Sequence, residues 1–162
     1  MNKQETFESK RLLFKGISEQ DFDYLVKWRS NLDLIKYFRN PTPITKESHI
    51  SWYEKSYLND LTRYDFVVID KNSGQKIGTV GVNSIDYEKG TCEISYIIAE
   101  NDFRRKGFAS EAVLTMINKV RMEGILTVHA EIHKENLASI KMIQKLGFNK
   151  ISEQGDISIF TL

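Results

Sequence analysis

The sequence has one cysteine, two prolines and almost no excess charge. Its single thiol, Cys92, excludes an internal disulfide and suits a reducing compartment. Because 23 basic residues stand against 22 acidic ones, the chain lacks the positive excess that proteins use to bind nucleic acids or acidic membranes. No apolar run approaches the roughly 20 residues that cross a bilayer, and the polar start at residues 1–5 does not resemble a signal peptide. We expect a cytoplasmic protein that binds neither nucleic acid nor membrane.

Two common phosphate-binding motifs are also missing. No GxxxxGK(S/T) element is present, and no GxGxxG follows a strand near the N-terminus, so neither a nucleotide triphosphatase nor a Rossmann dinucleotide site is supported. Linkers, repeats and low-complexity segments are absent as well. A chain of 162 residues buries about two-thirds of its unfolded surface, which is enough for one core. We expect a single α/β domain over residues 1–162.

Hydrophobic periodicity and turn residues predict alternating strands and helices. A proline loop at Pro41 and Pro43 separates two early helices, and Gly155 is expected to turn a C-terminal hairpin. The predicted strands are 11–16, 64–70, 76–86, 91–99, 127–133, 150–154 and 156–162. The predicted helices lie at 21–29, from Thr45 through Tyr57, at 108–120 and at 136–147.

A basic, glycine-containing turn stands directly before an amphipathic helix in the segment from Arg104 to Ala112. Apolar residues at three- and four-residue spacing as far as Val120 predict one buried helix face. The free N–H groups of the first turn and the helix dipole favour an anion. Gly107 and Ala109 leave room for phosphates at the backbone, and the basic side chains before them add positive charge. The pattern predicts a diphosphate site.

The segments on either side of this turn have a defined order. The strand at 91–99 leads into the turn, and the strand at 127–133 follows the amphipathic helix. A second helix opens at Asn136 and closes at Gly147, a residue suited to a left-handed C-cap. The order is therefore strand, anion turn, helix, strand, helix.

This region, from about Cys92 to Phe148, resembles the acetyl-CoA-binding half of the GNAT superfamily of N-acetyltransferases. Both family motifs are present in the right order, and the similarity is greatest to the branch of ribosomal-protein alanine N-acetyltransferases, whose last helix reads NxxSxxxxxKLGF. The matching residues are Arg104, Gly107 and Ala109 of the RxxGxA motif, and Asn136, Ser139 and residues 145–148 of the second motif.

The resemblance implies a mixed, mostly antiparallel sheet of six or seven strands flanked by helices. A splay between two central strands, ending near Ile98 and His133, would hold the pantetheine arm of acetyl-CoA. Residues 1–63 would form a variable wall for the acceptor, and residues 64–162 the sheet core with the acetyl-CoA site. The implied acetyl-CoA contacts are Ile97, Ile98, Arg104, Arg105, Lys106, Gly107, Phe108, Ala109, Ser110, Asn136 and Ser139.

Glu93 is the leading candidate for the base that accepts the proton of the amine. Strand alternation places it on the same face as Ile97, close to the expected thioester, and the resemblance implies a carboxylate at this position that acts directly or through water. A solvated or ion-paired Glu93 is the alternative. Glu131 and His133 are weaker candidates for the base. They share a strand face with His129, but we expect no metal there.

The residue that protonates the leaving thiolate is a departure from the family pattern. The resemblance implies a Tyr seven residues after the Asn that opens the last helix, and this chain has Ile143 there. The thiolate would then leave unprotonated, which a thiol pKa of about 8.5 tolerates, or with help from water or another residue. Tyr96 lies on the strand face opposite Glu93 and is expected in the core. Cys92 is likewise expected to be a core residue.

Aromatic and arginine side chains crowd the first 63 residues. Core packing is the alternative to a role in binding, but Arg29 and Arg39 could hold a phosphate or carboxylate by bidentate bonds. The sequence from Lys27 to Arg29 is also similar to acetyltransferases of nucleotide-linked amino sugars. The candidate acceptor contacts are Trp28, Arg29, Tyr37, Phe38 and Trp52, with Arg39 and Tyr53 beside them.

Together these features predict an acetyl-CoA-dependent N-acetyltransferase that releases coenzyme A. The acceptor is expected to be a protein or peptide N-terminus or a small amine. The acetyl group would pass to it directly within a ternary complex. The alternatives are an N-acetyltransferase of a nucleotide-linked amino sugar and a non-catalytic acetyl-CoA-binding regulatory module. A homodimer is compatible with the sequence.

Overall fold

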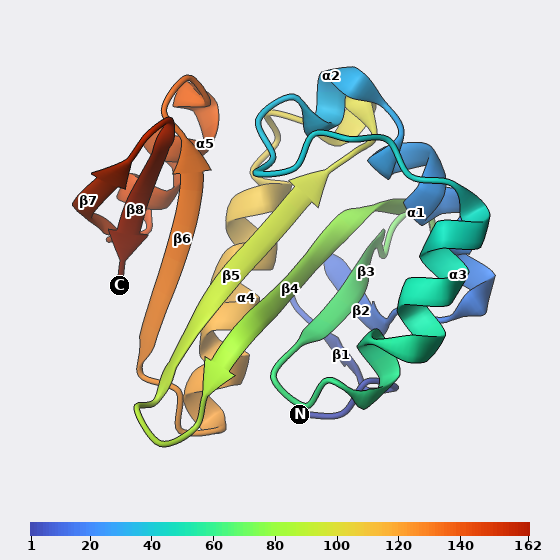
Figure 1. Cartoon of the computed structure of the whole chain (residues 1–162), viewed down its shortest axis with the longest axis horizontal. Coiled ribbons are helices and arrows are strands. Elements are labelled where there is room, and N and C mark those ends of the chain that lie inside the picture. The colour runs from blue at the N-terminus through green and yellow to red at the C-terminus, as the bar shows by residue number, and fades with distance from the viewer.

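One sheet of eight strands organises residues 1–162 in this computed structural model (Figure 1). Its strand order is β1-β2-β3-β4-β5-β6-β8-β7, and only the β5–β6 pair is parallel. The expected mixed, mostly antiparallel sheet is confirmed, with one more strand than expected because a short N-terminal strand pairs at the edge. The strands are β1 (Thr6–Glu8), β2 (Leu12–Gly16), β3 (Tyr64–Asp70), β4 (Lys76–Asp86), β5 (Thr91–Ile98), β6 (Thr127–His133), β7 (Asn149–Gln154) and β8 (Ile157–Thr161).

Five helices flank the sheet. Thr45 caps α3 by accepting a hydrogen bond from the Ser48 N–H at 3.1 Å. This helix ends at Lys55, and Tyr57, which was expected in it, lies in a separate 3₁₀ turn at Tyr57–Asn59. None of the helices combines the length and the hydrophobicity needed to cross a membrane. The helices are α1 (Phe22–Arg29), α2 (Leu32–Ile35), α3 (Lys46–Lys55), α4 (Phe108–Met122) and α5 (Leu137–Lys145).

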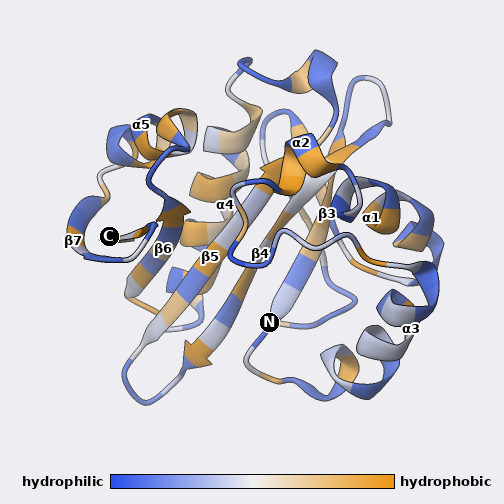
Figure 2. Cartoon of the chain, turned by 45° about the horizontal axis from the view of Figure 1, so that its top comes forward, coloured by the Kyte–Doolittle hydropathy of each residue, from blue (hydrophilic) through white to orange (hydrophobic).

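The helices cover both faces of the sheet. Alternate residues of β3 belong to two different hydrophobic clusters, with Phe66 and Val68 in the larger one and Val67 in the smaller. The larger cluster contains the buried face of α4 and Ile143 of α5, while the smaller contains α1 and the 3₁₀ turn that follows α3. Hydrophobic residues follow the central strands and α4 in Figure 2. The sheet therefore separates the α4 layer from the α1–α3 layer.

The two central strands part after a short pairing. β5 and β6 are hydrogen-bonded only from Thr91 to Glu93 on β5 and from Thr127 to His129 on β6. Beyond Glu93 the strands diverge, and β6, β8, β7 and α5 form a separate group beside the opening (Figure 1). The expected splay is therefore present, and residues 94–98 of β5 have no strand partner on that side.

Glycine stands at the start of one motif helix and at the end of the other, as the sequence indicated. Gly107 precedes α4 with a left-handed φ of 80°, and Gly147 follows α5 with a φ of 97°. The buried stripe of α4 is confirmed at Ala112, Val113, Met116, Ile117 and Val120. On α5, Ile143 is fully buried, whereas Leu137 is 60% exposed. Leu137 is the first residue of α5, so its side chain lies beyond the part of the helix that packs on the sheet.

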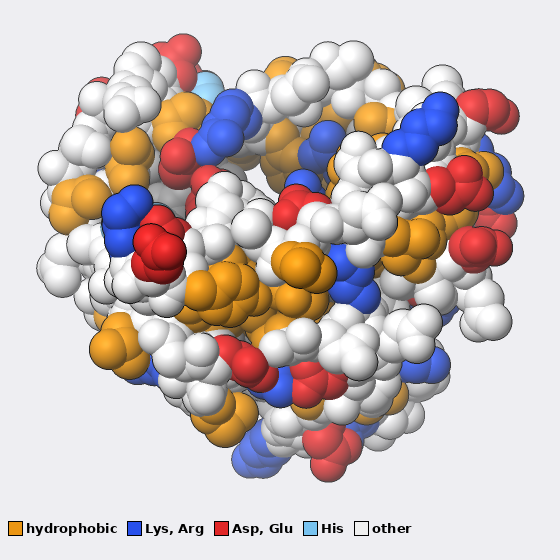
Figure 3. All heavy atoms as spheres, turned by 60° about the horizontal axis from the view of Figure 1, so that its bottom comes forward, with side chains coloured by type: hydrophobic (Ala, Val, Ile, Leu, Met, Phe, Trp, Pro, Cys, Tyr) orange, Lys and Arg blue, Asp and Glu red, His pale blue; other side chains and the backbone are white.

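Charged side chains are dispersed over the surface. On the face drawn in Figure 3, acidic and basic side chains alternate without a large patch of either sign. This distribution agrees with the near balance of charge in the sequence. It offers no extended basic surface on this face.

Candidate active site

A cavity of about 680 Å³ occupies the splay and the space in front of it. Side chains from residues 17–63 form one wall, and β3, β4, β5, β6, the start of α5 and Ile157 of β8 form the rest. Both faces of β5 reach this cavity, since Glu93, Ser95 and Ile97 line it together with Ile94 and Tyr96. The separation of β5 from β6 explains this, because it opens the sheet edge to both of its faces.

Glu93 lies at the last paired position of β5, where the splay begins. Its side chain is 23% exposed and lines the cavity. Burial and the nearby carboxylate of Glu131 raise its pKa, against the opposing charge of Arg39. A carboxylate with a raised pKa is a stronger base, so Glu93 has the position and the electrostatics of a proton acceptor.

Arg39 joins the two carboxylates. Its Nη2 is paired with Glu131 and lies 3.5 Å from Oε2 of Glu93. Glu131 is one step further along the same face of β6, two residues after the His129 that pairs with Glu93. His133 also lines the cavity and has its ring centroid 5.5 Å from that of Tyr37, whereas His129 does not line it. Arg39 therefore already has acidic partners and is not free to hold an anion.

The predicted anion turn presents unpaired backbone donors. The N–H groups of residues 105–110 donate no hydrogen bond within the protein, and no side chain caps α4. Gly107 is exposed, and a Cβ built on it would lie 3.4 Å from Nη2 of Arg11. These orphan donors at a helix N-terminus fit the diphosphate of a coenzyme A group.

The basic residues of the turn differ in their roles. Arg104 donates through Nε to the Ile98 carbonyl at 3.0 Å and through Nη2 to the Ala99 carbonyl at 2.9 Å. Its guanidinium thus ties the turn to the end of β5, whereas Arg105 and Lys106 are exposed. The side chain of Phe108 is buried in the larger cluster, so only its backbone can face a phosphate.

A further support of the turn was not foreseen from the sequence. Glu111, in the first turn of α4, accepts hydrogen bonds from Nε of Arg11 at 2.6 Å and from Oγ of Ser9 at 2.7 Å. Arg11 also donates to the Lys106 carbonyl at 2.9 Å. Because these partners are about 100 residues apart, no local pattern signals them.

Asn136 and Ser139 lie at the other side of the splay. The Asn136 side chain accepts a hydrogen bond from the Ser139 N–H at 3.3 Å and so caps α5. The Ser139 hydroxyl lies 2.9 Å from the Tyr96 hydroxyl. Tyr96 packs against the larger cluster, as expected, but it also lines the cavity. Burial raises the pKa of Tyr96 to about 12, so the phenol stays protonated at neutral pH.

Two residues that bear on the reaction chemistry are buried. Cys92 lies in the larger cluster, and burial raises its pKa to about 12, so it is a thiol rather than a nucleophilic thiolate. Ile143 is fully buried in the same cluster. The position of the usual tyrosine acid is therefore filled by a packing residue.

The cavity wall formed by residues 17–63 contains most of the aromatic residues that were expected to contact the acceptor. Trp28, Tyr37, Phe38 and Trp52 line the cavity. Tyr53 does not, because its ring packs on Phe22 and Tyr57 and its hydroxyl bonds the Ile17 carbonyl. Trp28 also belongs to the smaller cluster and donates through Nε1 to Glu100 at 2.8 Å. Core packing and cavity lining are thus combined in this residue.

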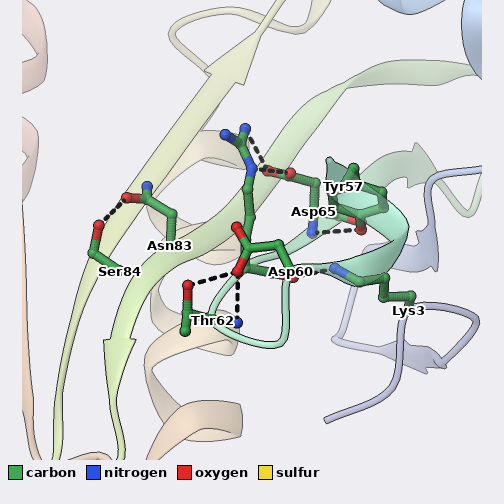
Figure 4. A network of polar contacts seen from close by, with 8 residues as sticks. Lys3, Tyr57, Asp60, Thr62, Asp65, Asn83 and Ser84 are labelled. Carbon is green, nitrogen blue, oxygen red and sulfur yellow. Dashed lines mark hydrogen bonds and ion pairs between the residues drawn. The ribbon is translucent and has the colours of Figure 1, made fainter. Parts of the chain in front are cut away.

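Several polar residues of the cavity were missed by sequence reasoning. Asn83 pairs with Glu93 across β4 and β5, and Asp65 accepts a hydrogen bond from Nε of Arg63 at 2.6 Å. The Asp65 N–H also donates to the Tyr57 hydroxyl at 3.1 Å (Figure 4). His49 on α3 completes this set. Their spacing in the sequence carries no motif, so only the pairing of β3, β4 and β5 and the packing of α3 beside the sheet bring them together.

Comparisons with known proteins agree with this geometry. A family model of the acetyltransferase (GNAT) domain matches residues 11–149. The N-acetyltransferase p20 of Bacillus licheniformis, itself described as uncharacterized, is 34% identical over 151 residues, which cover 90% of this chain and 83% of that protein.

Two solved structures share the fold. Spermidine N-acetyltransferase from Vibrio cholerae, in complex with CoA and spermine, is similar with a TM-score of 0.85 at 19% identity over 95% of this chain and 96% of that one. A ribosomal L7/L12 alpha-N-protein acetyltransferase in complex with coenzyme A has a TM-score of 0.78 at 14% identity, over 98% and 97% of the two chains. The family match covers both sequence motifs and the sheet between them, and the chain belongs to the GNAT family of acetyltransferases.

Proposed function

We propose that this chain transfers the acetyl group of acetyl-CoA to a primary amine by direct attack within a ternary complex. The observation that carries the proposal is that Arg104 and β5 connect the anion turn to the splay at Glu93. Arg104 fixes the unpaired N–H groups of residues 105–110 to the end of β5, and the free edge of β5 leads from there back to Glu93. A diphosphate at the turn would thus extend its pantetheine arm along the splay.

The binding residues follow from these free donors. The diphosphate would accept hydrogen bonds from the backbone of residues 105–110, with Arg105 and Lys106 adding charge. The pantetheine amides would pair with the open edge of β5 near Ile97 and Ile98, as an added strand does. Asn136 and Ser139 would contact the arm from α5. Bound acetyl-CoA supplies the thioester whose carbonyl carbon the amine attacks.

Glu93 is the proposed base. As the nitrogen forms its bond to the acetyl carbon and the carbon–sulfur bond breaks, the amine proton passes to the Glu93 carboxylate, directly or through water. A backbone N–H near Ile97 or Ile98 would stabilise the oxyanion. A covalent acetyl-cysteine route is not favoured, because Cys92 is buried and its pKa is raised to about 12.

Tyr96 is the proposed hydrogen-bond donor to the departing sulfur. Its hydroxyl lies 2.9 Å from that of Ser139, both residues line the cavity, and a pKa of about 12 keeps the phenol protonated. Full proton transfer to a thiolate of pKa about 8.5 would be uphill, so the phenol would stabilise the thiolate rather than neutralise it. Tyr96→Phe should lower kcat several-fold with little change in coenzyme A affinity, and an unchanged kcat would remove Tyr96 from the reaction.

The acceptor is proposed to be a protein or peptide N-terminus or a small amine. The fold shared with the L7/L12 and spermidine enzymes supports both classes. A nucleotide-linked amino sugar is the second candidate, favoured by the arginine and aromatic residues of the acceptor wall. A non-catalytic acetyl-CoA-binding module is the third, and the absence of a tyrosine at Ile143 is what supports it.

The test is acetyl-CoA-dependent thiol release over a panel of N-terminal peptides, amino sugars, polyamines and aminoglycosides. When both substrates are varied, a ternary complex should give intersecting lines in double-reciprocal plots of the initial rate. An acetyl-enzyme intermediate would give parallel lines. Binding of acetyl-CoA measured by calorimetry, with no turnover of any amine, would favour the non-catalytic module. Failure to bind acetyl-CoA would refute the proposal.

A further inference from the structure

One arginine of the cavity has no acidic partner. Arg29, at the last position of α1, is half-buried and forms no ion pair and no side-chain hydrogen bond. Its guanidinium lies 4.8 Å from the centre of the Phe38 ring, a contact that leaves the donors at its edge free. Burial and the positive charge of Arg63 lower its pKa. Arg29 therefore places an uncompensated positive charge against the cavity.

His49 adds an unsatisfied polar group to the same wall. It is only 7% exposed, it lines the cavity, and its Nε2 is buried without a hydrogen-bond partner. Its ring is held between Phe22, with centroids 4.9 Å apart, and Trp52, with centroids 5.3 Å apart. Buried polar atoms normally have partners. An unpartnered nitrogen on a residue that lines the cavity is thus a candidate contact for a bound group.

The charges around these two residues are mostly positive. Arg63 is paired with Asp65 and lies with its guanidinium 5.1 Å from the Trp52 ring. Asp65 neutralises Arg63 and leaves Arg29 uncompensated. At the splay, by contrast, the single Arg39 faces both Glu93 and Glu131. The cavity therefore has an acidic end at the splay and a basic end between α1 and α3.

We infer that the amine acceptor carries an anionic group, a carboxylate or a phosphate, which is bound by Arg29 and His49 while its amine faces Glu93 and Glu131. This inference rests on the proposed acetyl transfer and specifies the acceptor class. A planar guanidinium can bind either oxyanion through two parallel hydrogen bonds. An imidazole nitrogen can supply a third contact, as a donor when it carries the proton.

The same arrangement excludes polycations as good acceptors. A polyamine that placed one amine at Glu93 would bring another positive charge toward Arg29, with no free carboxylate there to receive it. Spermidine is the acceptor named for one structure of the same fold. The acceptor chemistry of this chain therefore differs from that of a polyamine enzyme.

The first test measures anion binding without turnover. The chain has two tryptophans, Trp28 and Trp52, and both line this cavity, so their fluorescence reports on the basic end. Inorganic phosphate and succinate are titrated at constant ionic strength in the presence of saturating coenzyme A, which occupies the anion turn. We expect a saturable change in the wild type and at least tenfold weaker binding in Arg29→Gln. His49→Phe, which keeps an aromatic ring, should weaken binding by a smaller factor.

A matched control separates specific binding from general charge. Lys46→Gln removes one positive charge from the start of α3, where Lys46 is exposed, pairs with Asp23 and does not line the cavity. It should bind phosphate as the wild type does. Equal binding by wild type and Arg29→Gln, or no saturable change in the wild type, would overturn the inference.

The second test compares matched acceptors. Glucosamine 6-phosphate against glucosamine tests phosphate, alanine against alaninamide tests carboxylate, and spermidine tests the excluded class. The kcat/KM of the anionic member of at least one pair should exceed that of its neutral member tenfold, and Arg29→Gln should abolish the preference. A preference for spermidine would contradict the inference. If phosphate binds at the tryptophans but coenzyme A does not bind by calorimetry, the proposed transfer fails and the anion site remains.

Discussion

Glu93 experiences two opposing influences on its charge. Burial and Glu131 raise its pKa, while Arg39 lowers it. In the unfolded chain Glu93 would titrate as an ordinary glutamate. Because the raised pKa disfavours the charged form in the fold, Glu93 lowers stability as the pH rises from the unfolded pKa through the folded one, and the loss persists above both values. A group that lowers stability and lines a cavity is a candidate for function.

We predict that Glu93→Gln lowers kcat by about a hundredfold or more, the range of a positioned general base. Coenzyme A affinity should stay nearly unchanged, because the anion turn is a separate part of the site. At pH 7.5 the melting temperature should stay the same or rise, since an amide removes the buried charge. A loss of activity under threefold with the true acceptor would assign Glu93 a structural role and direct attention to Glu131 or His133.

Arg39 should set the pH range of the reaction. Its charge lowers the pKa of Glu93, so in Arg39→Gln this pKa should rise further. The protonated, inactive form of the base would then persist to higher pH, and the acidic limb of the kcat/KM profile should move upward. Lys46→Gln is the control for loss of a remote charge. An acidic limb that stays in place or moves downward in Arg39→Gln would show that another group titrates.

At the scale of the element, α4 combines a packed stripe with an open N-terminus. Gly107, with a left-handed φ of 80°, precedes the unpaired first N–H groups of the helix, and the Arg11–Glu111 contacts hold the turn from the side of β2. The helix is thus packed where it meets the sheet, and its first N–H groups have no partner in the protein. The anion turn depends on this combination.

We predict that Gly107→Glu abolishes acetyl-CoA binding, because the new carboxylate would lie against the diphosphate. Gly107→Ala is the comparison, since it introduces only the strain of a side chain at positive φ, about 1–2 kcal/mol. Calorimetry on both variants, with circular dichroism to confirm folding, separates charge from strain. Unchanged affinity in a folded Gly107→Glu would refute the anion turn.

On helix α5, Ile143 is fully buried, so we expect it to matter for stability rather than for the reaction. Ile143→Ala should cost about 2–5 kcal/mol of unfolding free energy, seen as a fall of roughly 2–4 °C in melting temperature per kcal/mol. Activity per folded molecule should stay within a few-fold. Leu137→Ala on the same helix, at a 60% exposed position, should change stability by no more than about 0.5 kcal/mol. An Ile143→Ala variant that melts like wild type yet is inactive would show that position 143 shapes the reaction.

At the scale of the whole molecule, the proposed acetyl-CoA site spans the two groups of strands that part at the splay. The anion turn follows β5, whereas Asn136 and Ser139 follow β6. Bound coenzyme A would therefore join these groups, which share only a short stretch of direct pairing. A ligand that binds only the folded state stabilises it in proportion to its occupancy.

We predict that coenzyme A at a hundred times its dissociation constant stabilises the fold by about 2.7 kcal/mol, or roughly 5–10 °C in melting temperature. Hydrogen exchange should slow at β5 and at the start of α5 together. Gly107→Glu should show neither effect. Protection confined to α4 would mean that the ligand does not bridge the splay.

Local patterns determined most of the fold and the proposed acetyl-CoA half of the site. Strand alternation, the buried stripe of α4 and the glycines at 107 and 147 are properties of neighbouring residues, so the sequence contained them. The short β1 strand was not predicted from the sequence, because its three residues form a strand only by pairing with β2. The end of α3 at Lys55 was also not predicted, because the tertiary packing of Tyr57 decided it.

The sequence alone determined the family motifs, the expectation of a mixed, mostly antiparallel sheet, and the candidate base. Only the tertiary structure decided which charges neutralise one another. Arg29 and Arg39 looked equivalent in the sequence, yet the fold pairs Arg39 with Glu93 and Glu131 and leaves Arg29 beside the orphan His49. The physical reason is that ion pairing depends on distances of a few ångströms between residues far apart in the chain. No periodicity within a strand or helix records those distances.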